Sequence, residues 1–330
     1  MRRRWAAIPG AMAATALSLA ACVTSQVRLP LHPVPAGASV AVQAAALVLD
    51  PSDPKRIGVG DFHYAGGLIV TSTATSRLHG LSDLLVQPDG ALLAVSDDGD
   101  RFTGKLVLDE TGRLVGLTQA TIQPLTGPVD EALQGKDWGD AEGVTRMAGG
   151  AIMVSFERHH RIWLYQAAND RRPVAEPIPS VAMANNDGME GLAAAPTVGP
   201  DAYWVGVEPG TIWICHLKLS CTEVLGLPKP PAGYRLSSLT TGPNGELVIL
   251  HHSYVAAVGS QIVVTIIRDP MGARQIIGSF KMAPPLSVEN FEGVSVVKHS
   301  DRWRLYLLSD DNFSDGQRTL LLAFDWTPPK

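Results

Sequence analysis

Short apolar stretches bounded by turn residues recur along the chain, and they repeat one internal order. The order is clearest between Asn290 and Trp326, where an apolar stretch opens with Glu292-Gly293. A second stretch ends in Ser309-Asp310-Asp311, and a third runs from Thr319 to Phe324. Alternating apolar and polar positions between turn residues are typical of β-strands. The pattern predicts a repeating unit of several strands.

Five copies of this unit follow one another. The equivalent positions at their first strands are Ser82, Glu142, Glu190, Ser237 and Glu292, at intervals of 60, 48, 47 and 55 residues. This period is typical of β-propeller blades, which must stack around an axis to bury their faces. The first and fourth copies carry Ser where the other three carry the Glu of a Glu-Gly pair. The first strand of each copy is expected to line a central channel.

The predicted fold class is all-β, with one β-propeller of five motif-bearing blades and five or six blades in total. No helical periodicity extends over fifteen residues after Cys22, and 32 Gly and 24 Pro suit many tight turns. The last copy ends after three strands. We therefore expect the segment from Ile57 to Ser72 to supply the missing outer strand, closing the ring by pairing the N- and C-terminal strands. Whether residues 37–72 hide part of a sixth blade is left open.

The N-terminus predicts a lipoprotein signal peptide over residues 1–22. Three arginines precede an apolar stretch from Trp5 to Leu19, and Leu19-Ala20-Ala21-Cys22 forms a lipobox. A plain signal peptide with a coincidental Cys is the alternative. The organisation expected is signal peptide 1–22, tether 23–56, and propeller 57–330. The protein would lie on the periplasmic side of a bacterial envelope, anchored by lipidated Cys22; Val23, in place of Asp, favours the outer membrane.

The net charge and the cysteine content limit the kinds of molecule and ion that the protein is expected to bind. Without the three arginines of the signal peptide, 24 basic residues face 32 acidic ones, a net charge of −8. Such a chain is not expected to bind nucleic acid and suits bound cations instead.

The cysteines Cys215 and Cys221 remain as an even pair, so a disulfide that joins the two strands of one hairpin is favoured over two buried thiols. No finger-like spacing supports a zinc site, and the chain is expected to be a monomer.

The repeated Glu-Gly pairs are the first candidate functional feature. Glu142, Glu190 and Glu292 would approach one axis, where repulsion would raise their pKa values unless a cation lay among them. Calcium is the predicted ion, since Ca²⁺ prefers oxygen ligands. The alternative is that each Glu accepts hydrogen bonds from backbone amides and only fixes the blades. Each Gly is expected to allow close backbone approach.

Acidic residues that end the second strand of each copy would lie over the same mouth. They are the candidate metal ligands Asp97, Asp98, Glu157, Glu208, Asp310 and Asp311. Basic residues beside them are candidates for binding a small anionic substrate: Arg101, Arg158, His159 and Arg318. The segment from Gly127 to Trp138 has no strand pattern and is expected to cross the mouth.

As a set, these motifs resemble the bacterial phytase-like family, described as having esterase-like activity of phytase. The resemblance covers roughly residues 62–326. It is carried by Gly80-Leu81-Ser82-Asp83-Leu84, Val95-Ser96-Asp97-Asp98-Gly99, Asp140-Ala141-Glu142-Gly143, Gly188-Met189-Glu190-Gly191-Leu192, Asn290-Phe291-Glu292-Gly293, Leu308-Ser309-Asp310-Asp311-Asn312-Phe313 and Gln317-Arg318-Thr319. The resemblance implies an exported β-propeller and a hydrolase of phosphate esters. The Asp-Asp-Pro-Ala motif of alkaline propeller phytases is replaced by Asp97-Asp98-Gly99-Asp100.

The sequence thus predicts a lipid-anchored hydrolase that cleaves a phosphate ester or related ester with the help of calcium. Glu142, Glu190 and Glu292 would be catalytic and would share the ion with Asp97, Asp98 and Asp310, while Arg101, Arg158 and Arg318 offset charge on the phosphoryl group. Two alternatives remain. One is a non-catalytic envelope propeller that binds a protein or glycan, and the other is a lactone or sugar-ester hydrolase.

Overall fold

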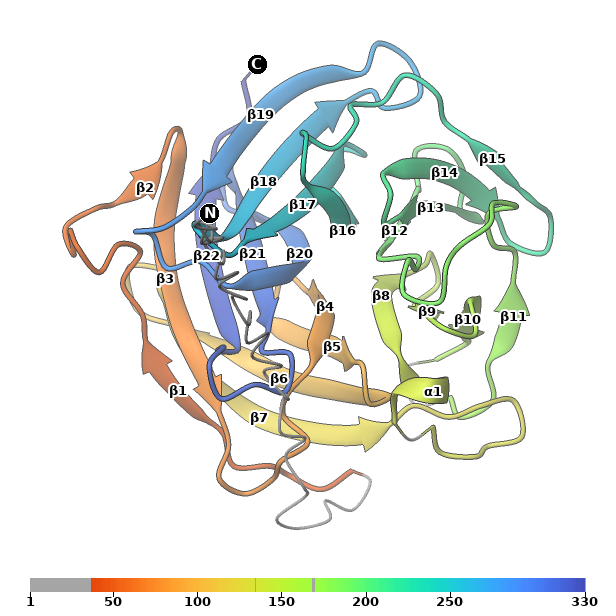
Figure 1. Cartoon of the computed structure of the whole chain (residues 1–330), viewed down its shortest axis with the longest axis horizontal. Coiled ribbons are helices and arrows are strands. Elements are labelled where there is room, and N and C mark those ends of the chain that lie inside the picture. Colours follow the sequence, from red (N-terminus) through yellow and green to blue (C-terminus); the bar gives the residue numbers. More distant parts are fainter. Residues whose placement is uncertain (1–36, 134, 168–169, 330) are drawn as a thin grey trace, which may run out of the picture.

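The computed structural model describes residues 37–133, 135–167 and 170–329, and over these residues it is a five-bladed β-propeller. Figure 1 shows the sheets arranged around a central axis, with β4, β8, β12, β16 and β20 as the innermost strands. The all-β prediction is confirmed. The predicted signal peptide over residues 1–22 and the predicted lipid anchor Cys22 lie outside the described residues.

Four blades each consist of four consecutive antiparallel strands. The first contains β4 (Leu81–Val86), β5 (Ala91–Ser96), β6 (Asp100–Leu108) and β7 (Leu114–Pro124). The second contains β8 (Ala141–Arg146), β9 (Ile152–Phe156), β10 (Arg161–Tyr165) and β11 (Val174–Glu176). The third contains β12 (Gly191–Ala194), β13 (Ala202–Val207), β14 (Thr211–His216) and β15 (Cys221–Glu223). The fourth contains β16 (Arg235–Thr241), β17 (Leu247–Val255), β18 (Gly259–Arg268) and β19 (Gln275–Met282).

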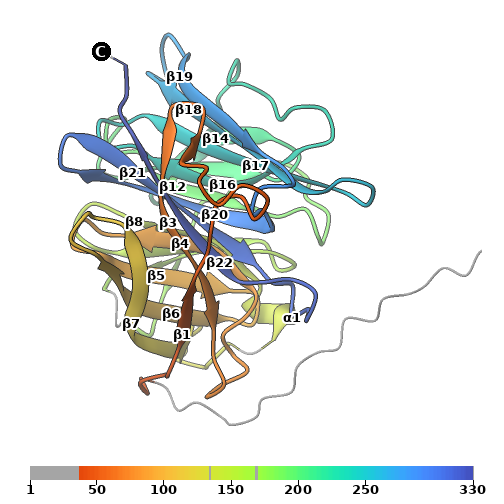
Figure 2. The same ribbon diagram turned by 90° about the vertical axis from the view of Figure 1, so that its left-hand side faces the viewer.

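The fifth blade joins the two ends of the described chain. It contains β20 (Asn290–His299), β21 (Arg302–Asp310), β22 (Leu320–Trp326), β3 (Phe62–Thr71) and β1 (Gln43–Ala46), with β2 (Gly58–Val59) pairing β3. β3 pairs antiparallel with β22, with Ile69 opposite Leu320 (Figure 2). The predicted ring closure is confirmed. Residues 37–72 contribute strands to the fifth blade and do not form a sixth.

Each blade packs both of its faces against a neighbouring blade, which explains the unbroken apolar runs in the sequence. In β17, Leu247 and Ile249 pack against residues of the third blade, while Val248 and Leu250 pack against the fifth. Successive side chains of a strand point to opposite faces. A strand covered on both sides therefore has apolar residues at consecutive positions, and polar residues remain at its ends and in the turns that follow.

The described part of the predicted tether, from Gly37 onward, lies against the propeller. Val40 and Leu49 are buried, and Ser287 donates a backbone hydrogen bond of 2.7 Å to the Leu49 carbonyl oxygen. A disulfide between Cys215 and Cys221 joins β14 to β15. Within the described residues, no helix has the length and apolar content needed to span a bilayer.

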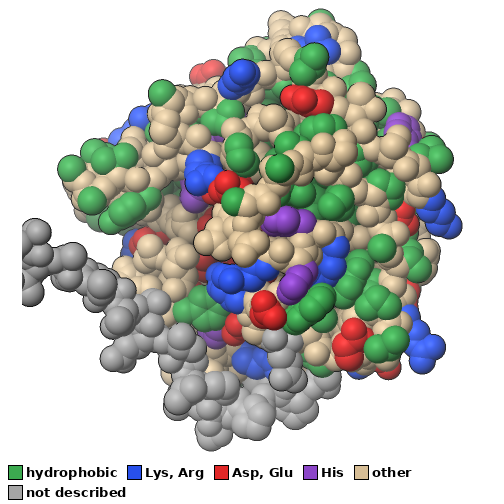
Figure 3. All heavy atoms as spheres, turned by 45° about the vertical axis from the view of Figure 1, so that its right-hand side comes forward, with side chains coloured by type: hydrophobic (Ala, Val, Ile, Leu, Met, Phe, Trp, Pro, Cys, Tyr) green, Lys and Arg blue, Asp and Glu red, His purple; other side chains and the backbone are tan. Residues whose placement is uncertain are grey.

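The surface drawn in Figure 3 mixes side chains of every kind. Acidic, basic and histidine side chains lie among hydrophobic ones. The exposed large apolar residues include Ile57, Val129 and Leu219, which lie far apart in the sequence. Single exposed apolar side chains are ordinary on a soluble surface.

Candidate functional site

In four blades, a β-bulge leaves the repeated Glu or Ser without a partner in the neighbouring strand. In the second blade, Ala141 pairs with Phe156 and Gly143 with Ser155, so Glu142 is an extra residue without a partner. Glu292 is the extra residue between β20 and β21. Ser82 and Ser237 hold the same position in the first and fourth blades. A bulge bends its strand and redirects one side chain, and here it redirects the residue that the repeat keeps polar.

The glycine after each Glu allows two blades to approach closely. A Cβ placed on Gly143 would lie 2.7 Å from Ser155 Oγ, 2.8 Å from Leu192 Cβ and 3.0 Å from the Glu190 carbonyl oxygen. A Cβ on Gly191 would meet Leu239 Cγ at 2.4 Å. These contacts agree with the close approach expected from the sequence, because a side chain at either position would overlap the neighbouring blade.

These bulges surround a small polar cavity of about 130 Å³ at one end of the channel. Seven carboxylates line it, and they come from four of the five blades: Asp97, Glu142, Glu157, Glu190, Glu208, Glu292 and Asp310. The fourth blade contributes the neutral side chains of Ser237 and His252 instead. We call this cavity the acidic mouth.

Burial and mutual repulsion raise the pKa values of the carboxyl groups in the acidic mouth. Burial raises the pKa of Glu142 well above its ordinary value, and the charges of Glu190 and Asp97 raise it further. Glu292 and Asp310 are raised by burial first and then by neighbouring carboxylates. A proton or a cation must therefore offset these charges.

Two carboxyl groups at the edge of the acidic mouth have pKa values near neutrality. Burial, with repulsion from Asp140 and Glu208, raises the pKa of Glu157 to about 7. Burial raises the pKa of Glu208 to about 7, although Arg235, with its Nε 2.8 Å from Glu208 Oε1, opposes the shift. Groups that titrate near pH 7 can exchange protons under physiological conditions.

Lys136 supplies a positive charge to this cavity. It begins the short helix α1 (Lys136–Gly139), forms an ion pair with Asp97, and lies with Nζ 3.7 Å from Asp140 Oδ1. Nearby carboxylates, Asp97 first, raise the pKa of Lys136 even though burial lowers it. The segment expected to cross the mouth thus contains the lysine that lines it.

A chain of polar contacts links the fourth and fifth blades across the cavity. His252 Nδ1 lies 2.8 Å from Asn290 Oδ1, and Asn290 Nδ2 donates a 2.6 Å hydrogen bond to Glu292 Oε1. Burial lowers the pKa of His252 despite its contact with Asn290. The imidazole is thus neutral at pH 7 and positioned beside Glu292.

Two of the predicted metal ligands do not line the acidic mouth. The Asp311 carboxylate accepts a backbone hydrogen bond from Gly80 (3.1 Å) and another from Phe313 (3.2 Å), so it ties the fifth blade to the first. Asp98 is partly exposed, with its Oδ2 3.9 Å from His79 Nε2.

The four predicted substrate-binding residues are dispersed. Arg158 Nε donates to Asp140 Oδ2 at 2.6 Å, beside the acidic mouth. His159 stacks on Trp138 with ring centroids 3.8 Å apart. Arg318 donates to Glu289 Oε1 at 2.7 Å, and Arg101 points into a different pocket between the first two blades.

The carboxylates of the acidic mouth fit a hard cation. One oxygen from each of Asp97, Asp140 and Glu142 lies within 4.8 Å of the others, and so does one from each of Glu142, Glu157 and Glu190. Asp140 Oδ1 is buried without a hydrogen-bond partner among the described residues and has only its ionic contact with Lys136. Oxygen ligands of this kind suit calcium.

Sequence reasoning did not assign a role to Lys136, Asp140, Asn186, Arg235 or His252, although all lie in or beside the acidic mouth. Asp140 was visible as part of the Asp140-Ala141-Glu142-Gly143 motif. His252 was visible as one of two neighbouring imidazoles, of which only one can face the channel. Lys136 and Asn186 carry no repeat signal, because they lie outside the strands of the blades, and Arg235 begins β16 at a position where the other blades carry no basic residue.

Comparison with known proteins identifies one family. Residues 76–313 match the phytase-like family, described as esterase-like activity of phytase. No curated protein matches the chain. Among solved structures, allergen Mala s 1 of Malassezia sympodialis is 14% identical, with 82% of this chain and 91% of that chain covered and a TM-score of 0.44. Virginiamycin B lyase of Staphylococcus aureus is 9% identical, with 86% and 99% covered and a TM-score of 0.41.

Proposed function

This chain belongs to the phytase-like family, and we propose that it is a calcium-assisted hydrolase of a phosphate ester or related ester. The reaction takes place at the acidic mouth. The lipobox at Cys22 supports an exported, lipid-anchored protein on the periplasmic side of a bacterial envelope.

The convergence of seven carboxylates on one cavity carries this proposal. With Lys136 as the cation among the described lining residues, the cavity as it stands would repel an anionic ester. A bound calcium ion would reverse that repulsion, polarise a phosphoryl oxygen and lower the pKa of an attacking water. The ligands proposed for it are Asp97, Glu142, Glu190, Glu292 and Asp310, with Asp140 beside them.

The remaining polar residues of the mouth have separate tasks in this mechanism. Lys136 donates hydrogen bonds to an anionic oxygen of the ester and offsets its charge. Glu157 and Glu208, which titrate near pH 7, accept a proton from water or return one to the leaving group. Arg158, fixed on Asp140, adds positive charge at the edge.

The first test is thermal unfolding and turnover of the chain from Val23 onward, with calcium and with a chelator. A ligand that binds only the folded state raises the melting temperature by mass action. We expect calcium to raise it, and p-nitrophenyl phosphate or a carboxylic ester to be cleaved only when calcium is present. A melting temperature that is identical in calcium and in chelator would overturn the proposed cation site.

One set of contacts favours a second function, a non-catalytic propeller whose carboxylates fix the blades. Asp83, at the centre of the ring, accepts hydrogen bonds from Val144 N (2.9 Å) and Ser238 Oγ (3.0 Å), which belong to the second and fourth blades. If Glu142, Glu190 and Glu292 acted in the same way, replacing each by Gln would lower the melting temperature with or without calcium. In a catalytic site the same changes abolish turnover while the fold survives.

A further inference from the structure

Arg101 lies in a pocket that the proposed reaction does not use. It is the second residue of β6, and its neighbour Phe102 packs into the core shared with the fifth blade. Since side chains alternate along a strand, Arg101 points to the opposite face, toward the second blade. Asp97, before β6, therefore lines the acidic mouth, while the guanidinium of Arg101 enters the interface between the first two blades.

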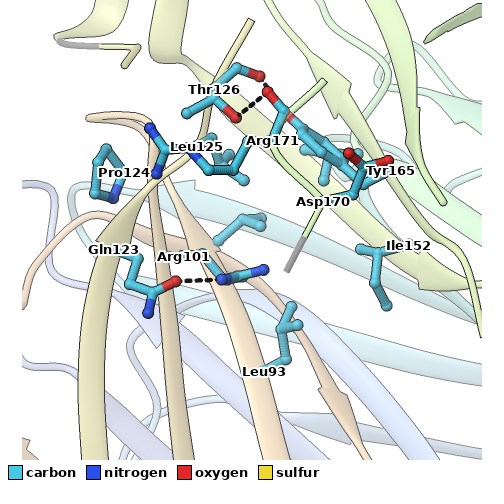
Figure 4. A pocket seen from close by; sticks show the side chains of 12 residues that line it. Leu93, Arg101, Gln123, Pro124, Leu125, Thr126, Ile152, Tyr165, Asp170 and Arg171 are labelled. Atoms are coloured by element: carbon cyan, nitrogen blue, oxygen red, sulfur yellow. Dashed lines mark hydrogen bonds between the residues drawn. The ribbon is translucent and has the colours of Figure 1, made fainter. Parts of the chain in front are cut away.

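This interblade pocket has a volume of about 230 Å³. Its apolar wall is formed by Leu93 and Val95 of the first blade and by Ile152 and Val154 of the second. Figure 4 shows Arg101 joined to Gln123 by a hydrogen bond, with Leu93 and Ile152 on the other side. The pocket thus combines a cationic group with an apolar wall.

The guanidinium of Arg101 has no carboxylate partner among the described residues. Its Nε–H is buried without a hydrogen-bond acceptor, and its Nη2 donates to the neutral Gln123. Asp170 lines the same pocket, but its two oxygens accept backbone hydrogen bonds from Gln166 (2.9 Å) and Arg172 (3.1 Å). Arg171, on the rim, donates to Asp130. The Arg101 side chain is half-buried, and a charge that is partly withdrawn from water without a counter-ion gains stability when a ligand supplies one.

We propose that the interblade pocket is a second ligand site, which binds a small carboxylate that carries an apolar group. The carboxylate pairs with the Arg101 guanidinium through charge-assisted hydrogen bonds, for which the fork of N–H groups is well suited. The apolar group contacts Leu93 and Ile152. The pocket is smaller than the roughly 300–1,000 Å³ of sites for drug-sized ligands, which limits the ligand to about one ring or a short acyl chain.

Three probes distinguish the contribution of the ligand's negative charge from that of its apolar group: benzoate, its neutral isostere benzamide, and inorganic sulfate. Binding to the full chain is measured by isothermal titration calorimetry. We expect benzoate to bind with one-to-one stoichiometry, and benzamide and sulfate to bind at least about tenfold more weakly, since each lacks one of the two interactions. Absence of benzoate binding, or equal binding of benzoate and benzamide, would overturn the proposal.

Arg101→Met tests the residue itself. It should lower benzoate affinity at least about tenfold, and without ligand its melting temperature should equal or exceed that of the unchanged protein, because an uncompensated charge is removed. Arg302→Met, on the exposed start of β21, is the matched control and should retain benzoate binding. Benzoate affinity that is unchanged in Arg101→Met, or lost equally in Arg302→Met, would contradict the site.

Discussion

At the residue scale, the extra residue of each bulge determines which polar group that strand brings to the channel mouth. Glu142 and Glu292 bring a carboxylate to the axis, whereas Ser82 and Ser237 bring a hydroxyl to the same place. Ser82 Oγ donates to Asp97 Oδ1 at 2.6 Å, so the hydroxyl orients a neighbouring carboxylate. The mouth is therefore asymmetric, with its charge concentrated away from the fourth blade.

Glu292→Gln should abolish function without damaging the fold. The change removes one proposed cation ligand and one repelling charge. Turnover should fall by about 10²-fold or more, as when one electrostatic group is lost from an active site, while the melting temperature in chelator stays equal or rises. Parallel kinetic and calorimetric assays measure both effects. Glu223→Gln, on exposed β15, is the control, and full activity in Glu292→Gln would refute the mechanism.

Lys136→Met should change calcium binding and substrate binding in opposite directions. Without the ammonium that pairs with Asp97 and approaches Asp140, the cavity becomes more negative. Calcium should bind about tenfold more tightly, a difference of about 1.4 kcal/mol, and the KM for an anionic ester should increase. Calorimetric titration and steady-state kinetics test these changes, with exposed Lys298→Met as the control. Calcium affinity that does not rise would show that Lys136 does not share the cation's space.

At the scale of elements, three blades begin with a carboxylate that is followed by a glycine, and the glycine allows the neighbouring blade to approach: Glu142-Gly143, Glu190-Gly191 and Glu292-Gly293. Ser155 shows how tightly this is built: its Oγ accepts from Gly143 N at 2.9 Å and donates to the Met189 carbonyl oxygen at 2.7 Å. The hydroxyl thus links β9 to the chain that leads into the third blade. Little space is left for a methyl group at Gly143.

Gly143→Ala should therefore lower stability, by about 1–3 kcal/mol as expected for overpacking. Gly316→Ala is the matched control, because the nearest atom to its added Cβ, Ser314 Oγ, is 3.6 Å away. Chemical denaturation of both variants gives the comparison. Equal stabilities of the two variants would contradict the close approach at the second blade.

The repeated elements were predictable from the sequence, and the unrepeated ones were not. The spacing of Ser82, Glu142, Glu190, Ser237 and Glu292 was sufficient to predict the blades and the convergence of their side chains. The direction of the Arg101 side chain depends on the residue at which β6 begins after a polar loop, because successive side chains of a strand point to opposite faces. The position of Lys136 depends on a connection that belongs to no strand. Neither feature leaves a periodic signal, so both required the structure.

At the scale of the whole molecule, the acidic mouth couples stability to pH and to calcium. Glu157 and Glu208 have ordinary pKa values of 4.5 and folded values of about 7. Between these values the folded chain holds more protons than the unfolded chain. The free energy of unfolding therefore falls as pH rises through this range, when no cation is present.

Melting temperatures measured from pH 5 to pH 8 should show this coupling. In chelator we expect the melting temperature to decrease across the range. Calcium should reverse the decrease at pH 8 and have little effect at pH 5, where protons compete for the same oxygens. In Glu157→Gln the decrease in chelator should be smaller. A calcium effect that is as large at pH 5 as at pH 8 would contradict a site built from these carboxylates.

The pairing of β3 with β22 also determines the order in which the molecule can be completed. The first four blades form from consecutive hairpins, but the fifth needs strands from opposite ends of the chain. Such distant pairing is a slow step in folding. During synthesis β3 must wait for nearly the whole propeller before its partner exists. A chain that ends before Leu320 would leave two unpaired strand edges, available to the edges of other unfinished chains.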